Sequence, residues 1–142
     1  MTAIFAFTGA TSAPTADIAY GQITTEVSVS EEMFLMGGTE TESIVREYFS
    51  DIPVMVQVAR CESTFRHTLA DGSVLKGRVD PADTGVMQIN KRYHESTANK
   101  LGLNLENIYD NMAYARHLYD TQGTQPWSAS SPCWGRTLAA NI

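Results

Sequence analysis

The sequence predicts a single α+β domain, mostly helical, with one small β-hairpin. A chain of 142 residues has room for one domain with a substantial core. Its hydrophobic fraction of 43% and charged fraction of 18% are typical of a globular protein. Several segments repeat apolar residues at helical spacing, whereas Asp71-Gly72, between Thr68-Leu69 and Val74-Leu75, is typical of a hairpin turn.

The first part of the chain differs in composition from the rest. The first positively charged side chain is Arg46, and residues 8–19 are rich in Ala, Thr and Ser. We therefore predict a leader over residues 1–38, either mobile or the remnant of a secretory signal, followed by a domain over residues 39–142. The apolar stretch at residues 4–7 is short for a signal, which favours a mobile leader.

Two helices are expected at the start of the domain. Thr39-Glu40-Thr41-Glu42 has the spacing of a capping box and predicts the start of the first helix. Asp51 as N-cap and Pro53 in the first turn predict a second helix, which ends between residues 61 and 65. The expected apolar faces are Ile44, Val45, Tyr48 and Phe49 in the first helix and Val54, Met55, Val58 and Ala59 in the second.

Turn signals divide the rest of the chain into further elements. The expected elements are a hairpin over residues 68–75, a short extended or turn segment over 86–89, and helices over 96–101 and 110–119. Gly102 and Gly123 are expected to end the two helices, with Asp110 at the start of the second. Asn104 is expected to cap a short turn between them.

Glu62 is the strongest candidate for a chemical role. It lies four residues beyond Val58 in the second predicted helix and therefore shares the inward face of that helix. Burial disfavours the charged form of a carboxyl group, and an acid that stays protonated near neutral pH can protonate the leaving oxygen of a glycosidic bond. The alternative is a solvated Glu that only caps the helix end. For an isolated Glu this alternative would be preferred, but the inward phase and the motifs that flank Glu62 together favour function.

Three short motifs give the chain a resemblance to a known family. They are Glu62-Ser63, Gly85-Val86-Met87-Gln88-Ile89 and Asn111-Met112. In this order and spacing they are similar to the Glu-Ser, Gly-Leu-Met-Gln-Ile and Asn-Ile motifs of the catalytic domain of soluble lytic transglycosylases and goose-type lysozymes. The resemblance runs from about residue 52 to residue 111, a little under half of the chain.

The resemblance implies a lysozyme-like fold and cleavage of the β-1,4 bond between N-acetylmuramic acid and N-acetylglucosamine in peptidoglycan. Glu62 would be the general acid, and Ser63 would help to orient it. The family implies attack by the muramoyl 6-hydroxyl, which leaves a 1,6-anhydro end while Glu62 acts as base. We expect this non-hydrolytic outcome. The alternative is a hydrolytic lysozyme, which needs a second carboxylate. Asp80 and Asp83 are the candidates for it, although we favour for both the role of shaping the Pro-containing loop in which they lie.

Other side chains are candidates for substrate binding. Gln88 and Asn90 carry donors and acceptors suited to acetamido groups and hydroxyls. The alternative, stronger for Asn90 than for Gln88, is that these side chains satisfy the backbone of the turn. Tyr93 and Trp127 could stack on sugar rings, although Trp127 could equally cover the core. The family often carries a Tyr-Asn-Ala-Gly stretch whose Tyr hydrogen-bonds near the acid, and this chain lacks it. Tyr114 is our candidate for that support, with core packing as the alternative.

Cys61 and Cys133 are the two cysteines of the chain. They do not form a Cys-x-x-Cys motif, so neither a zinc site nor a thioredoxin-type site is implied. Cys61 directly precedes the candidate acid and Cys133 lies beside Trp134, so we predict a disulfide between them. Such a bond indicates an extracytoplasmic protein, whether secreted, periplasmic or associated with the cell wall. Two buried thiols are the alternative.

Charge and histidine spacing narrow the expected partners. The net charge of −6 argues against nucleic acid, and no apolar run approaches the roughly eighteen residues of a membrane span. His67, His94 and His117 are too scattered for a ligand set, so we expect no metal or other cofactor. The expected partner is the peptidoglycan glycan strand, bound by a monomer. The rival function is a glycan-binding module of the same fold without turnover.

Overall fold

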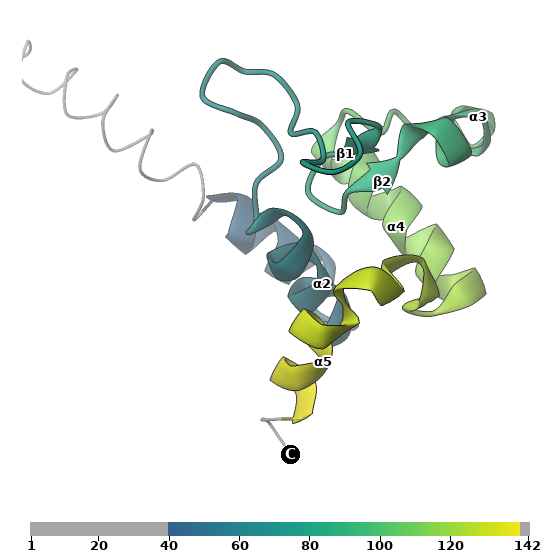
Figure 1. The fold of residues 1–142 in the computed structure, drawn as a ribbon. Coiled ribbons are helices and arrows are strands. Elements are labelled where there is room, and N and C mark those ends of the chain that lie inside the picture. Colours follow the sequence, from purple (N-terminus) through teal and green to yellow (C-terminus); the bar gives the residue numbers. More distant parts are fainter. Residues whose placement is uncertain (1–39, 140–142) are drawn as a thin grey trace, which may run out of the picture. The chain divides into compact units, whose positions relative to one another are not determined.

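The computed structural model describes residues 40–139 of the chain (Figure 1). The predicted leader over residues 1–38 and Thr39 of the predicted capping box lie outside the described residues. The described part begins with a helix over residues 40–48. The elements that follow are α2 (Pro53–Ser63), β1 (Asp83–Thr84), β2 (Ile89–Asn90), α3 (Lys91–Lys100), α4 (Ile108–Gln122), the 3₁₀-helix η1 (Gln125–Ser130) and α5 (Ser131–Ala139).

The domain is mostly helical and contains one small antiparallel sheet, as the sequence predicts. The strands β1 and β2 form a hairpin in which Asp83 pairs with Asn90 and Thr84 pairs with Ile89. The hydrophobic core lies between the helices and the turn that joins these two strands. Its largest fully buried apolar side chains are Tyr114, Phe49, Met55, Met87, Met112, Val45, Val58 and Val86.

The start of α2 differs from the prediction that Asp51 is its N-cap. Ile52 occupies the cap position without a side-chain hydrogen bond, and Pro53 begins the helix. The Asp51 carboxylate instead accepts two hydrogen bonds, each 2.8 Å long, from the guanidinium group of Arg116 on α4. This bidentate pair uses both carboxylate oxygens, so neither is left to cap the helix.

The end of α2 agrees with the sequence prediction. Met55, Val58 and Ala59 are fully buried, and the helix ends at Ser63. Thr64 and Phe65 then adopt left-handed backbone conformations, both with a φ of 55°. This αL pair reverses the chain directly after the helix, so Glu62 lies in its last turn.

The hairpin that the sequence places around Asp71-Gly72 is present as a turn closed by a single bridge, with hydrogen bonds from the Leu69 N–H to Ser73 and from the Leu75 N–H to His67. Gly72 has a φ of +82°, and Thr68 and Val74 form an isolated bridge rather than a ladder. The actual two-stranded hairpin is β1–β2. Leu69 beside the turn is 42% exposed, whereas Ile89 of β2 is 2% exposed. A two-stranded hairpin needs a packed face to be stable, and only β1–β2 has one.

The turn between β1 and β2 is held by a buried amide on α4. The Asn111 Oδ1 accepts a hydrogen bond from the Met87 N–H at 3.0 Å. The Nδ2 donates to the carbonyl oxygens of Thr84 at 3.0 Å and Leu105 at 2.9 Å. Gly85 has a φ of +73°, and a Cβ atom there would lie 2.7 Å from Asn111 Nδ2. The turn is therefore fixed against α4 by the hydrogen bonds of Asn111 and by the close approach that a glycine at position 85 allows.

Two helix starts lie earlier than the sequence predicts. The predicted helix over 96–101 is α3, which begins at Lys91 because the Asn90 side chain caps it through the Arg92 N–H. The predicted helix from Asp110 is α4, whose N-cap is Asn107. In both helices an Asn side chain, rather than the apolar period, sets the start. The predicted stop of α4 at Gly123 is confirmed.

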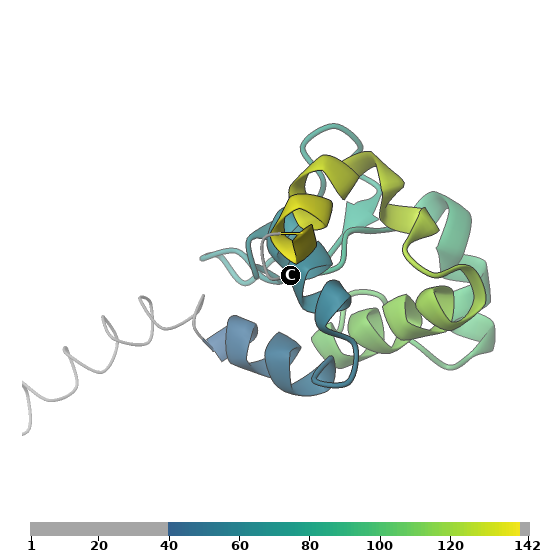
Figure 2. The same cartoon turned by 90° about the horizontal axis from the view of Figure 1, so that it is seen from below.

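The C-terminal segment packs back against α2. Figures 1 and 2 both show α5, in yellow, beside α2. Cys61 in α2 and Cys133 in α5 form the predicted disulfide, which spans 72 residues of sequence. Arg60 adds a hydrogen bond of 2.7 Å to the Thr137 hydroxyl. The end of α2, where Glu62 lies, is therefore tied covalently to the start of α5.

Candidate functional site

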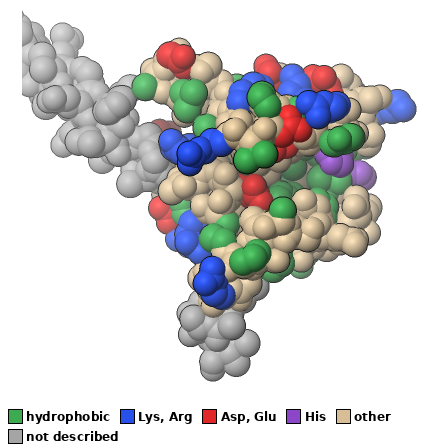
Figure 3. All heavy atoms as spheres, viewed as in Figure 1, with side chains coloured by type: hydrophobic (Ala, Val, Ile, Leu, Met, Phe, Trp, Pro, Cys, Tyr) green, Lys and Arg blue, Asp and Glu red, His purple; other side chains and the backbone are tan. Residues whose placement is uncertain are grey.

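Glu62 borders a pocket of about 180 Å³. The pocket takes residues from α2, the β1–β2 hairpin, α3, α4 and η1. They are Glu62, Asp83, Gln88, Ile89, Asn90, His94, Leu118, Pro126, Trp127 and Ala129. Figure 3 shows acidic, histidine and hydrophobic side chains close together on one face of the molecule. The walls of the pocket therefore combine one acid from a helix end with the amide-bearing hairpin.

The pKa of the Glu62 carboxyl group is raised above its ordinary value of 4.5. Burial is the largest cause, because it disfavours the charged form. The negative charge of Asp83 raises the pKa further, and a hydrogen bond from Ser130 opposes the shift. The position at the end of α2 therefore favours a protonated carboxyl group, as a general acid requires.

Ser130 makes a short hydrogen bond to Glu62. Its Oγ lies 2.6 Å from Glu62 Oε1 and 3.0 Å from the carbonyl oxygen of Trp127. No sequence motif marks Ser130, and the prediction missed it. It lies three residues before Cys133, which the disulfide holds next to the residue preceding Glu62. The predicted disulfide between Cys61 and Cys133 is the one sequence signal from which a position of Ser130 near Glu62 could have been predicted.

Trp127 lines the pocket and is 4% exposed. Its indole Nε1 donates to the Met87 carbonyl oxygen at 3.0 Å. The Trp127 carbonyl oxygen accepts from Trp134 Nε1 at 3.1 Å. Trp127 therefore covers the core and borders the pocket at once, and it joins η1 to the β1–β2 turn.

The structure separates the two candidate second carboxylates. Asp83 lines the pocket with Glu62, whereas Asp80 does not. Asp80 accepts from the Ala82 N–H at 2.9 Å and pairs with Arg92 at 3.2 Å. Hydrogen bonds hold the pKa of Asp80 below its ordinary range. The bond from the Ala82 N–H has the largest effect, and Asn90 and Arg92 have smaller ones. Asp80 therefore shapes the loop, and Asp83 is the candidate that shares the pocket with Glu62.

Asn90 lines the pocket, but its side-chain amide is hydrogen-bonded to other groups of the protein. The Nδ2 donates to Asp80 Oδ2 at 2.9 Å and to Asp83 Oδ1 at 2.8 Å, and the Oδ1 caps α3. Both amide hydrogens are thus in use, and the role that fits this geometry is to fix Asp83 in the pocket.

Gln88 lines the pocket in an unusual backbone conformation. Its φ is +50°, in the left-handed region, and its Nε2 donates to the Gly85 carbonyl oxygen at 2.8 Å. That bond uses one of the two amide hydrogens. A non-glycine residue in this region is uncommon and is often associated with a functional site.

Besides Asp80, three predicted site residues lie outside the residues that line the pocket. The Ser63 hydroxyl donates to the Ala59 carbonyl oxygen at 3.0 Å and accepts from the Arg66 N–H at 3.2 Å. It therefore closes the end of α2 instead of orienting Glu62. Tyr93 is 72% exposed on α3. Tyr114 is 1% exposed and belongs to the core.

His94 is a pocket residue that the sequence did not predict. Its Nδ1 lies 3.1 Å from the Tyr114 hydroxyl, so Tyr114 supports His94 rather than Glu62. Burial lowers the pKa of His94 below its ordinary value of 6.5. The ring is therefore neutral at neutral pH and presents a donor or acceptor without adding charge to the pocket.

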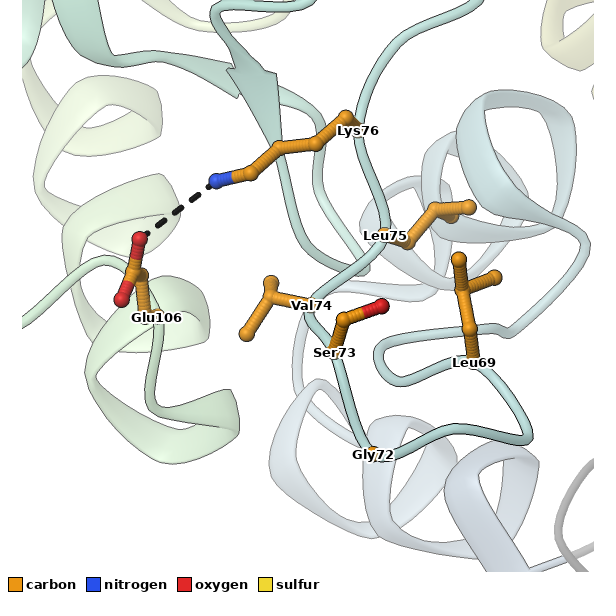
Figure 4. A pocket seen from close by; sticks show the side chains of 7 residues that line it. All are labelled: Leu69, Gly72, Ser73, Val74, Leu75, Lys76 and Glu106. Atoms are coloured by element: carbon orange, nitrogen blue, oxygen red, sulfur yellow. Dashed lines mark hydrogen bonds and ion pairs between the residues drawn. The ribbon is translucent and has the colours of Figure 1, made fainter.

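A larger depression of about 580 Å³ does not include Glu62. Figure 4 shows its side chains on the loop that contains Leu69 and Val74, with Lys76 reaching toward Glu106. Their ion pair measures 3.4 Å. Apart from this pair the lining is mostly apolar and includes no second carboxyl group, and the hydroxyl of Ser73 donates to Asp71 Oδ1 at 2.5 Å. The smaller pocket is therefore the candidate functional site.

No group of three or more His, Cys, Asp or Glu side chains in residues 40–139 could hold a metal ion. No helix within that range is long and apolar enough to cross a membrane. Comparisons of the chain with protein-family models, curated proteins and solved structures found no match.

Proposed function

We propose that this chain cleaves the β-1,4 glycosidic bond between N-acetylmuramic acid and N-acetylglucosamine in peptidoglycan, with Glu62 as general acid and then base. The observation that carries the proposal is a half-buried carboxyl group with a raised pKa in a pocket beside Gln88 and Asp83. Glycosidic oxygen is a poor leaving group, so its departure needs a proton donor that stays protonated near neutral pH.

The motif resemblance supplies the substrate class. Glu62-Ser63, Gly85 to Ile89 and Asn111-Met112 are the residues that carry it. In the structure Glu62 and Gln88 line one pocket, while Asn111 holds the turn that carries Gln88. The proposal therefore includes a lysozyme-like arrangement, in which a catalytic helix end faces a hairpin wall. It also includes a monomer that binds glycan strands outside the cytoplasm, consistent with the Cys61–Cys133 disulfide.

The favoured outcome is non-hydrolytic. Glu62 protonates the leaving oxygen, and the resulting carboxylate accepts the proton of the muramoyl 6-hydroxyl as that oxygen attacks C1. The product carries a 1,6-anhydro end, and no water is consumed. One titratable group at the site is enough for this sequence, because Glu62 performs both proton transfers.

Hydrolysis is the second candidate, and the position of Asp83 favours it. Asp83 lines the same pocket, and its charge contributes to the raised pKa of Glu62. In an inverting hydrolase a second carboxylate activates a water molecule on the opposite face of the sugar. Asn90 holds Asp83 at 2.8 Å and could orient it for that role.

Mass spectrometry of digested sacculi tests the proposal and separates its two forms. Anhydro-muropeptides from the wild-type protein, retained in Asp83→Asn, support the non-hydrolytic reaction. Reducing ends alone, lost in Asp83→Asn, support hydrolysis with Asp83 as base. If sacculi bind the protein but release no muropeptides, the chain is a glycan-binding module and the enzymatic proposal is wrong.

A further inference from the structure

The Ser130 hydroxyl lies between two acceptors that it cannot serve together. Its Oγ is 2.6 Å from Glu62 Oε1 and 3.0 Å from the Trp127 carbonyl oxygen. A serine hydroxyl has a single proton to donate. The Trp127 carbonyl oxygen also accepts from Trp134 Nε1 at 3.1 Å. It therefore keeps a partner when Ser130 turns toward Glu62.

We propose that Ser130 is the positioning residue for Glu62, and that its hydroxyl turns between the Glu62 carboxylate and the Trp127 carbonyl oxygen as Glu62 gains and loses its proton. This inference rests on the proposed function for its catalytic meaning. Its structural content, a hydroxyl that follows the protonation state of Glu62, can be measured without substrate.

Each protonation state of Glu62 has one matching orientation of the hydroxyl. When Glu62 is ionised, Ser130 donates to Oε1 in a charge-assisted hydrogen bond. When Glu62 is protonated, its own O–H donates to Ser130 Oγ, and Ser130 donates to the Trp127 carbonyl oxygen. A carbonyl oxygen can only accept, so the direction of the second arrangement is fixed. In both states the contact between Ser130 and Glu62 is a hydrogen bond.

A residue that is first an acid and then a base benefits from such a partner. Without it, burial and the charge of Asp83 on β1 would raise the pKa of Glu62 with no hydrogen bond to oppose them. His94 on α3 also lines the pocket, and its lowered pKa leaves it neutral, so it adds no compensating positive charge. The Ser130 hydroxyl is the group whose hydrogen bond lowers the pKa of Glu62.

The support of Ser130 is rigid on both sides. Trp127 is anchored through its Nε1 to the Met87 carbonyl oxygen at 3.0 Å. Three residues beyond Ser130, Cys133 is bonded to Cys61, which directly precedes Glu62. The acid and its partner therefore lie on adjoining turns that are joined covalently, and only the hydroxyl proton has to move between the two states.

A carboxyl-carbon NMR titration of Glu62 in the substrate-free protein tests the inference. The variants are Ser130→Ala, which removes the hydroxyl, Ser130→Thr, which keeps it, and Ser128→Ala, an exposed serine of the same 3₁₀-helix. We expect Glu62 to titrate at higher pH in Ser130→Ala than in the wild type, and at the wild-type pH in Ser128→Ala. Ser130→Thr is expected to restore most of the difference.

The inference is overturned if Glu62 titrates at the same pH in the wild type and in folded Ser130→Ala. If Ser130→Ala does not fold, the comparison of Ser130→Thr with Ser130→Val, which have the same shape, decides in the same way. Each of these results is independent of turnover, so inactivity of the wild type on sacculi contradicts the proposed function and leaves the titration to decide the role of Ser130.

The pH dependence of turnover gives the catalytic readout. In Ser130→Ala we expect kcat to fall roughly tenfold, because a charge-assisted hydrogen bond to the developing carboxylate is lost. The alkaline limb of the profile should move to higher pH, while KM changes less than kcat. A loss of activity with an unshifted limb would assign Ser130 a packing role only and would contradict the inference.

Discussion

Removal of the Cys61–Cys133 disulfide is the perturbation whose effect follows most directly from the structure. The bond closes a loop with a sequence separation of 72. The chain-entropy relation gives roughly 15 cal/mol/K for a loop of this length, or about 4 kcal/mol at room temperature. For a domain of roughly 100 residues, a loss of this size lowers Tm by roughly 15–30 °C. We expect that change in the double variant Cys61→Ser with Cys133→Ser.

The variant should also lose activity below its melting temperature. α5 carries Cys133, and Ser130 directly precedes α5. Without the bond, α5 is held to the end of α2 by weaker contacts such as the 2.7 Å hydrogen bond from Arg60 to Thr137. Local opening of α5 would move Ser130 away from Glu62, so kcat should fall at temperatures at which the circular dichroism spectrum is still that of the folded protein.

Thermal melts followed by circular dichroism, with and without reductant, measure the effect. The wild type with reductant should match the double-serine variant, and the variant itself should not respond to reductant. A difference in Tm below about 5 °C between wild type and variant would refute the reasoning, since it corresponds to about 1 kcal/mol or less. Thiol titration of the unfolded, unreduced wild type should find no free thiol from either residue.

Three further predictions concern the turn and the acid. Gly85→Ala should lower the free energy of unfolding by about 2 kcal/mol or more, because the added Cβ would lie 2.7 Å from Asn111 Nδ2. The control Gly102→Ala, at a similar φ but with nothing within 4 Å of the added Cβ, should lower it by only about 1 kcal/mol. Equal losses in urea melts of the two variants would contradict the close approach at Gly85. Asn111→Leu should lower the free energy of unfolding by about 3 kcal/mol or more, because it leaves the buried Met87 N–H and two carbonyl oxygens without their partner. An unchanged free energy of unfolding in urea melts would show that the turn does not depend on Asn111. Glu62 has a raised pKa in the folded state, so the folded protein binds more protons than the unfolded chain between the two pKa values, and stability falls as pH rises through that range. Glu62→Gln should therefore raise Tm at neutral pH and leave it unchanged well below pH 4.5, and a Tm difference that does not depend on pH would contradict the shifted pKa.

Short sequence patterns predicted the apolar face of α2 correctly, but they did not predict the β1–β2 hairpin or the start of α3. The inward phase of Glu62 follows from the apolar period of α2, which buries Met55 and Val58 completely. The hairpin predicted at Asp71-Gly72 is present as a turn with one antiparallel bridge between Thr68 and Val74, and the two-residue strands β1 and β2 were not predicted as a hairpin. The start of α3 was predicted late because Asn90 was interpreted as a sugar-binding residue, whereas its side chain caps the helix.

The contacts that complete the site depend on residues far apart in sequence. Ser130 and Glu62 are 68 residues apart, and no local pattern distinguishes Ser130 from its serine neighbours. His94 and Tyr114 come from different helices and meet at 3.1 Å. The sequence predicted Tyr114 as support for Glu62. The structure shows Tyr114 buried behind His94, and only the packing of α3 against α4 could have revealed this.

Clearing of sacculi by the wild type and by Glu62→Gln tests the central claim most directly. Glu47→Gln, an exposed Glu on the helix over residues 40–48, is the matched control for the same chemical change. We expect clearing by the wild type and by Glu47→Gln, and none by folded Glu62→Gln, because Gln cannot donate the proton that the leaving oxygen needs. Equal clearing by wild type and Glu62→Gln, or no clearing by any of the three proteins, would contradict the claim.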